Sequence, residues 1–115
     1  YAKVSAVEKE SWGKLAETYL TTRKQLKIII LLVDIRHEPT RDDQVMLRFI
    51  RESGRKFVVV ANKADKIGRS GLKKHIDQIR ASLNLDENIE ILPFSALKKT
   101  GVEALWQKIE ETLQL

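Results

Sequence analysis

The feature that most constrains the fold of this chain is an uninterrupted apolar run at residues 27–34, which reads KIIILLVD. Polar and apolar side chains do not alternate along it, and strands of this kind are typically buried on both faces of a parallel sheet. The run is far shorter than the ~20 apolar residues that a membrane-spanning helix needs. We therefore predict a strand in the interior of a parallel sheet.

Helical and strand patterns alternate along the rest of the sequence. Strands are predicted at residues 27–34, 57–61 and 89–94, and helices are predicted to begin near residues 5, 40, 72 and 101. The second helix has clear ends, because Thr40 and Asp43 are spaced as a capping box and Gly54 favours a helix terminus. This alternation predicts an α/β fold, a parallel sheet with helices on both faces.

The position of the first strand conflicts with its composition. With right-handed connections, residues 27–34 can occupy an edge of a three-stranded sheet, where backbone groups are left unpaired. A run this apolar is expected in the centre of a sheet instead. We therefore expect further strands of the same sheet to lie outside this chain.

Two polar segments follow the second and third predicted strands, at the end of a parallel sheet where ligands bind. The first segment comprises Asn62, Lys63, Ala64 and Asp65, and the second comprises Phe94, Ser95 and Ala96. An N-K-x-D motif alone is a weak signal. With an S-A pair at the end of the next strand the signal is strong, and the two motifs together are typical of GTPases.

The residue types in these segments suit the recognition of guanine. The Asp65 carboxylate can accept hydrogen bonds from the ring N–H and the exocyclic amine of guanine, a pair of donors that adenine lacks. Asn62 can both donate and accept, so it can reach the base edge and join the two loops. The stem of Lys63 can lie against the base. Ser95 is placed to orient Asp65, and the backbone N–H of Ala96 can donate to the guanine oxygen.

Other interpretations of the polar residues are less specific. Asn62 and Asp65 also favour turns, so an ordinary strand-to-helix turn is the alternative for the first segment. His37 and His75 lie far apart with no triad or metal-ligand spacing, and the chain has no cysteine. Asp34, which ends the first strand, is expected to fix the following loop rather than to act as a catalytic acid.

A phosphate-binding loop of the form G-x-x-x-x-G-K-[ST] does not occur in the sequence, and its five glycines are dispersed. Without that loop there is no backbone cradle for phosphates, no lysine that reaches them and no hydroxyl for Mg²⁺. We therefore predict no catalytic residue and no metal ligand in this chain. The segment alone is expected neither to hydrolyse GTP nor to bind it tightly.

The chain has a net charge of +5, with basic clusters at residues 51–56, 73–74 and 98–99. A solvated surface accounts for these clusters, and contact with the phosphate backbone of folded RNA is the alternative. Aromatic residues do not interleave with the clusters, which argues against a surface on which bases stack.

Over essentially its whole length the sequence resembles the EngB (YihA/YsxC) family of bacterial ribosome-assembly GTPases. Residues 1–5 are similar to the stretch that follows the D-x-P-G-Y-G switch segment of that family. The block VDIRH at residues 33–37, followed by Pro39, resembles one that is peculiar to the family. Residues 62–66 and 94–96 match its base-recognition segments.

Two positions depart from the family pattern. Asn62 stands where members of the family often carry threonine, although asparagine is the commoner choice among GTPases. Leu97 stands where many GTPases place a lysine over the base, so an aliphatic side chain is expected to cover that face.

The resemblance implies a three-layer P-loop GTPase-type parallel sheet, of which this chain supplies about three strands and four helices. Residues 1–115 would then be the C-terminal portion of one GTPase domain, and an absent N-terminal portion would hold the phosphate loop, the switches and the Mg²⁺ ligands. The resemblance also implies GTP and GDP as ligands, the large ribosomal subunit and its rRNA as partners, a role in cell division, and the bacterial cytoplasm as location. The alternative is a non-enzymatic α/β interaction module that binds ribosomal RNA or protein.

Overall fold

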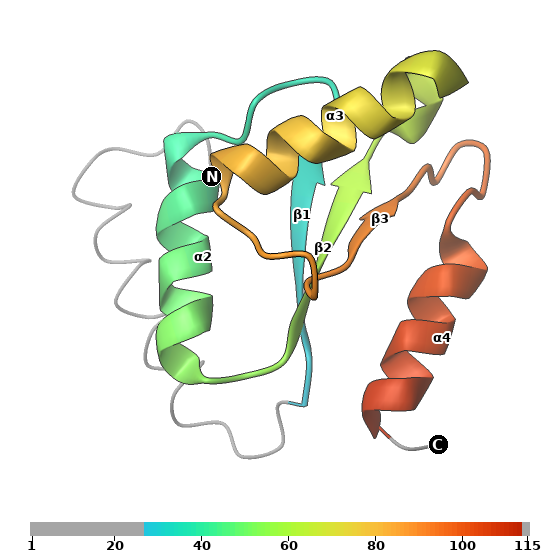
Figure 1. Cartoon of the computed structure of the whole chain (residues 1–115). Coiled ribbons are helices and arrows are strands. Elements are labelled where there is room, and N and C mark those ends of the chain that lie inside the picture. The colour runs from blue at the N-terminus through green and yellow to red at the C-terminus, as the bar shows by residue number, and fades with distance from the viewer. Residues whose placement is uncertain (1–26, 114–115) are drawn as a thin grey trace.

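The computed structural model of the chain describes residues 27–113. They form three strands and three α-helices that alternate along the chain, with a single turn of 3₁₀ helix (Figure 1). The elements are β1 (Ile29–Asp34), α2 (Arg41–Ser53), β2 (Phe57–Asn62), η1 (Ala64–Lys66), α3 (Arg69–Ser82), β3 (Ile91–Pro93) and α4 (Val102–Leu113). The helix predicted to begin near residue 5 lies outside the described residues.

The three strands form one parallel sheet in the order β1-β2-β3. In the register of β1 and β2, Asp34 is the partner of Asn62, and in that of β2 and β3, Ala61 is the partner of Pro93. The carboxyl ends of all three strands therefore lie at the same edge of the sheet. This confirms the predicted α/β fold and the expected neighbourhood of the two polar segments.

The hydrophobic core lies between one face of the sheet and the helices α2 and α3. Residues of alternating position in the strands face this core, as expected from the period of two along a strand. The core comprises Leu31, Val33, Ile35, Leu47, Ile50, Val59, Ala61, Ile79, Leu83, Leu85 and Ile91. Helix α4 lies on the other side of the strands from α2, so the sheet has helices on both sides (Figure 1).

Burial on both faces is found in β2 rather than in β1. Residues 58–61 of β2 have no exposed surface, whereas Leu32 of β1 is 59% exposed and Ile30 is 38% exposed. Within residues 27–113, β1 lies at an edge of the sheet, and its face that carries Ile30 and Leu32 is not covered as its other face is by α2 and α3. The prediction that residues 27–34 are buried on both faces is therefore wrong for the described structure.

Local signals set the ends of α2. The Thr40 hydroxyl accepts a hydrogen bond from the Asp43 N–H at 3.1 Å, and the Asp43 carboxylate accepts one from the Thr40 N–H at 3.0 Å. This is the predicted capping box, which satisfies two of the free N–H groups of the first turn. Gly54 follows the helix with a φ of +70°, a left-handed conformation that glycine adopts without steric cost.

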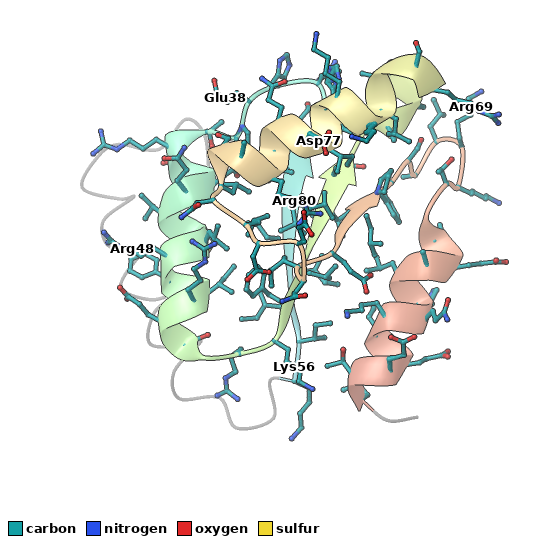
Figure 2. The ribbon with its side chains drawn as sticks, viewed as in Figure 1. Glu38, Arg48, Lys56, Arg69, Asp77 and Arg80 are labelled. Atoms are coloured by element: carbon teal, nitrogen blue, oxygen red, sulfur yellow. The ribbon has the colours of Figure 1, made fainter. Side chains whose placement is uncertain are left out.

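The third strand is shorter than predicted, at Ile91–Pro93 rather than residues 89–94. Arg80 of α3 holds the loop that leads to this strand, since its guanidinium donates to the backbone oxygens of Asp86 and of Ile89, the latter at 2.8 Å (Figure 2). Within residues 27–113, no helix is both long enough and apolar enough to span a bilayer.

Candidate functional site

The two predicted segments meet at the carboxyl edge of the sheet. Backbone hydrogen bonds join them directly: the Ala64 N–H donates to the Phe94 oxygen, and the Phe94 N–H donates to the Ala61 oxygen, both at 2.9 Å. The first segment turns into η1 straight after β2, and the second leaves β3 beside it. The predicted convergence of the N-K-A-D and S-A motifs is thus present in the structure.

A serine and an aspartate link the two loops through their side chains. The Ser95 hydroxyl donates to Oδ1 of Asp65 at 2.7 Å and accepts from the backbone N–H of Lys98 at 3.1 Å. Ser95 is 1% exposed, and its backbone forms a two-bond bridge with Thr100. The hydroxyl is therefore fixed in orientation, and it fixes the carboxylate in turn.

The surroundings of Asp65 keep its carboxylate ionised. The hydrogen bond from Ser95 lowers the pKa of Asp65 most, partial desolvation opposes it, and the charges of Lys66 and Lys98 lower it further. The side chain is only 8% exposed, with Oδ2 at 3.9 Å from the Lys66 ammonium. A carboxylate offers about four lone-pair sites, so Ser95 leaves acceptor capacity for two further donors. The donor pair of guanine fits such a group.

Lys63 adopts an unusual backbone conformation between β2 and η1. Its φ is +64°, in the left-handed region that non-glycine residues rarely occupy and that is often found at ligand sites. The side chain is 51% exposed, and its ammonium lies 3.5 Å from Oδ2 of Asp34. The lysine stem is thus available at the same edge of the sheet as Asp65.

Asp34 is held by its own loop, as the sequence predicted. Its Oδ1 accepts from the backbone N–H and Nε of Arg36 at 3.0 and 3.1 Å, and its Oδ2 accepts from Nη2 of Arg36 at 2.8 Å. These hydrogen bonds hold the pKa of the Asp34 carboxyl well below its usual range. The sequence did not reveal that Asp34 also contacts Lys63. Both residues come at the ends of apolar strands, but their contact depends on the register of β1 on β2, which the sequence does not reveal.

The remaining predicted residues lie at the same edge of the sheet but make fewer side-chain contacts there. Asn62 is half-buried and, within residues 27–113, its side chain makes no hydrogen bond, so the loops are joined by backbone bonds and Ser95 instead. Phe94 is half-buried, Ala96 is exposed, and Leu97 is 72% exposed.

Gly101 is a site residue that sequence analysis treated only as a helix start. It has a φ of +80°, and a Cβ added to it would overlap the backbone oxygen of Pro93. The loop from Ser95 to Thr100 can close back on β3 only because this position carries no side chain. The glycine therefore shapes the loop that presents Ser95.

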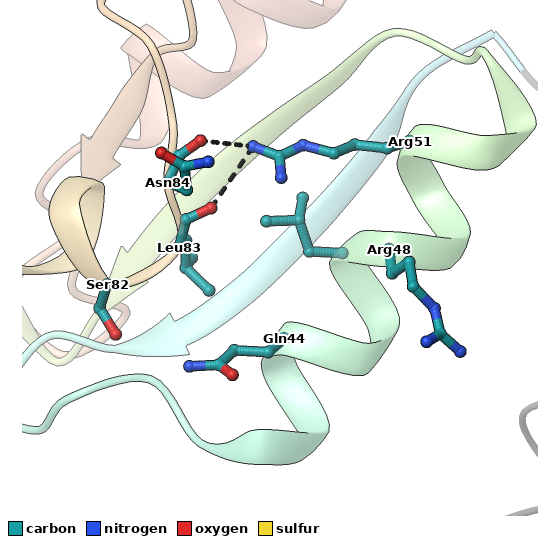
Figure 3. Close-up of a pocket in the computed structure, with 7 residues that line it drawn as sticks. Gln44, Arg48, Arg51, Ser82, Leu83 and Asn84 are labelled. Atoms are coloured by element: carbon teal, nitrogen blue, oxygen red, sulfur yellow. Dashed lines mark hydrogen bonds between the residues drawn. The ribbon is translucent and has the colours of Figure 1, made fainter.

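A separate pocket of about 220 Å³ lies between α2 and the end of α3 (Figure 3). It is lined by Gln44, Leu47, Arg48, Arg51, Ser82, Leu83 and Asn84. Nη2 of Arg51 donates to the backbone oxygen of Asn84 at 2.7 Å and to that of Leu83 at 3.4 Å, where α3 ends. An arginine here satisfies free carbonyls and complements the helix dipole. The role of Arg51 is therefore structural.

The described residues do not suggest a metal site. Within residues 27–113, no group of three or more histidine, cysteine, aspartate or glutamate side chains is arranged to hold a metal ion. Asp34 and Asp65 are each engaged with basic or hydroxyl partners instead.

Comparison with known families assigns the fold to a class of nucleotide-binding domains. The family described as the Elongation factor Tu GTP binding domain matches residues 14–115. This chain belongs to that family. The N-K-A-D and S-A segments both fall within the matched residues.

Curated relatives of this chain are named EngB, so the resemblance seen in the sequence is confirmed. The protein "Probable GTP-binding protein EngB" of Alkaliphilus oremlandii is 51% identical over 111 residues, 96% of this chain and 53% of the relative. The protein of the same name from Bacillus subtilis is 41% identical over 113 residues, 98% of this chain and 58% of the relative. The chain spans about half the length of the curated relatives it matches.

Solved structures support the same fold. A crystal structure of a probable GTP-binding protein EngB matches with a TM-score of 0.76 at 20% identity, over 94% of this chain and 65% of that protein. Translation elongation factor SelB from Methanococcus maripaludis, in its apo form, matches with a TM-score of 0.75 at 23% identity, over 89% of this chain and 23% of SelB. At these identities the matches show the GTP-binding domain fold alone.

Proposed function

We propose that this chain binds the guanine base of GTP and GDP through the edge of the sheet that carries Asp65 and Ser95. The observation that carries the proposal is the 2.7 Å hydrogen bond from Ser95 to Oδ1 of Asp65, which presents an ionised carboxylate at the N-K-A-D turn. Asp65 would accept the ring N–H and the exocyclic amine of guanine. Asn62, Lys63, Ala64, Phe94 and Ala96 complete the site that we assign to the base.

The arrangement discriminates guanine from adenine by two effects. Hydrogen bonds to a charged acceptor contribute about 1.5–3 kcal/mol each, and adenine cannot make the pair. Adenine would also leave the remaining acceptor sites of the nearly buried carboxylate without donors, and unpaired polar groups of this kind produce the largest specificity ratios among related ligands. The exposed Ala96 backbone adds a donor for the guanine oxygen, where adenine carries a donor of its own.

We infer that residues 1–115 are the C-terminal portion of one GTPase domain. The uncovered apolar surface of β1, at Ile30 and Leu32, supports this, because it is the surface that further strands and helices of such a domain would bury. Trp106 of α4 is a further exposed apolar side chain, at 60% exposure. The phosphate loop, the switches and the Mg²⁺ ligands would belong to the N-terminal portion.

Mg²⁺ would neutralise charge on the β- and γ-phosphates when the complete domain is loaded. The described residues of this chain contribute recognition and orientation of the base. The parent protein would therefore be the GTPase, and this segment alone would be inactive.

A role for the parent protein in assembly of the large ribosomal subunit, and in cell division in the bacterial cytoplasm, rests on the EngB resemblance. The basic surface of the chain supports contact with rRNA, although part of that charge is engaged within the protein. Arg51 holds the end of α3, and Lys73 pairs with Asp77 at 2.9 Å. Lys56 and Arg69 are among the exposed basic side chains that remain at the periphery (Figure 2).

Replacing Asp65 by asparagine in the full-length protein tests the assignment of the base site. An asparagine amide donates where the carboxylate accepted, so it matches the oxygen that xanthine carries in place of the guanine amine. We expect the affinity for GDP to fall at least tenfold and the affinity for xanthosine diphosphate to rise. Titration of fluorescent GDP and xanthosine diphosphate into the wild type and Asp65→Asn measures both.

The matched control is Asp77→Asn, which removes the charge of an exposed aspartate on α3 that is also paired with a lysine. This variant is expected to keep the preference for guanine. If Asp65→Asn also keeps that preference, the assignment of Asp65 is overturned and the non-enzymatic interaction module is favoured.

A further inference from the structure

We propose that Asp34 is a positioning residue that sets the orientation of the Lys63 side chain at the base site, with Arg36 holding Asp34 in place. The inference rests on the proposed function, since it concerns how the same site is prepared for the base. Asp34 lies outside both GTPase motifs, in the strand that precedes them along the chain and flanks them in the sheet.

Oδ2 of Asp34 is shared between Arg36 and Lys63. Two hydrogen bonds from Arg36 occupy Oδ1, and a third approaches Oδ2 from the guanidinium side. Oδ2 also lies 3.5 Å from the Lys63 ammonium. The carboxylate cannot turn away from the lysine without breaking hydrogen bonds to Arg36.

The sheet brings the pair together through its register. Asp34 and Asn62 are partner residues in β1 and β2, and the Ile35 N–H donates to the Asn62 oxygen at 2.9 Å beyond the last pair. Lys63 follows Asn62 with its left-handed φ of +64°. The positions of both charged groups are thus determined by backbone that the sheet itself holds.

Anchoring the tip of Lys63 prepares the stem for the base. A free lysine side chain samples many rotamers, and a ligand that needs one of them loses affinity by ordering the side chain. An ammonium already paired with Asp34 limits the rotamers before the ligand arrives. Asp34 therefore acts on nucleotide binding through Lys63 and touches no ligand itself.

A double-mutant cycle in the full-length protein tests this coupling, with the dissociation rate of fluorescent GDP as the readout. Asp34→Asn keeps the shape of the side chain and removes its charge, and Lys63→Met keeps an unbranched stem and removes the ammonium. The pair is partly exposed, so each variant is expected to release GDP about threefold faster. The double variant is expected to release GDP no faster than Lys63→Met.

A second cycle uses the urea midpoint of the nucleotide-free protein, where Asp34→Asn and Lys63→Met are expected to be non-additive. Asp77→Asn is the control and is expected to leave GDP release unchanged. The inference is overturned if Asp34→Asn accelerates GDP release equally in the wild type and in the Lys63→Met background. The inference is also overturned if the change in urea midpoint of the double variant equals the sum of the changes of the two single variants. If Asp65→Asn keeps guanine preference, the proposed function fails, which is a separate outcome.

Discussion

The hydroxyl of Ser95 donates to the carboxylate of Asp65 across a separation of 30 residues in the sequence, at a distance of 2.7 Å. The same hydroxyl accepts from the backbone N–H of Lys98, so it connects the loop after β3 to the turn after β2. This contact orients the Asp65 carboxylate and is the largest cause of its lowered pKa. Removal of the hydroxyl is therefore a direct probe of the site.

Ser95→Ala is expected to weaken GDP binding by the full-length protein about tenfold, because a charge-assisted hydrogen bond that orients the carboxylate is lost. Preference for guanine over adenine should be reduced but retained, since Asp65 itself remains. Titration with fluorescent GDP measures the change. Ser82→Ala removes a half-buried hydroxyl at the end of α3, which donates to Glu38 rather than to Asp65, and the variant should bind GDP as the wild type does.

The same variant has a predicted pH dependence. The pKa of Asp65 is lowered in the folded protein, so its hydrogen bond stabilises the fold above the ordinary aspartate pKa of about 4 and is lost as the pH falls below it. The urea midpoints of wild type and Ser95→Ala should therefore differ at pH 7 and converge towards pH 3. An equal difference at both pH values would show that the hydroxyl does not act on the ionised carboxylate.

Two kinds of feature were predictable from the sequence: local ones, and the residues that meet at the carboxyl edge of the sheet. The capping box of Thr40 and Asp43 depends on residues three apart, and it forms as expected. The meeting of Asp65 and Ser95 followed from a general property of parallel sheets, since both residues come directly after strands.

Features that depend on pairing between distant segments were not predictable. The contact of Lys63 with Asp34 requires the register of β1 on β2, which no local pattern encodes. The exposure of Leu32 depends on what packs against that face of the sheet, whereas an apolar run indicates burial only. The overlap that a side chain at position 101 would make with Pro93 depends on how closely the loop returns to β3.

Gly101→Ala is predicted to destabilise the protein more than Gly54→Ala. Both glycines have a positive φ, so both variants carry backbone strain of order 1–3 kcal/mol. Only Gly101 has a backbone oxygen in the way, whereas a Cβ at Gly54 would meet nothing within 4 Å. Urea midpoints of the two variants, measured in parallel, distinguish the two effects. Backbone strain lowers both midpoints, and overlap with the Pro93 oxygen lowers only that of Gly101→Ala. Equal midpoints would contradict the close return of the loop.

The proposed domain organisation predicts that one substitution on β1 has opposite effects in two contexts. Leu32 is 59% exposed in this chain, and an uncovered apolar edge strand favours self-association of the 115-residue chain. Leu32→Lys places a charge on this strand, in water, and should therefore reduce that self-association. In the full-length protein the same position would be buried by the N-terminal portion. Leu32→Lys should there lower the free energy of unfolding by at least the roughly 2–5 kcal/mol of a lost buried leucine.

Leu31→Lys is the matched control, because its side chain is only 6% exposed and faces the core that α2 and α3 cover. A lysine at this position should disrupt the fold in both contexts. Sedimentation of the short chain and urea unfolding of the full-length protein measure the two effects. If Leu32→Lys leaves the stability of the full-length protein unchanged, the outer face of β1 is exposed there too, and the inference that an N-terminal portion buries it is overturned.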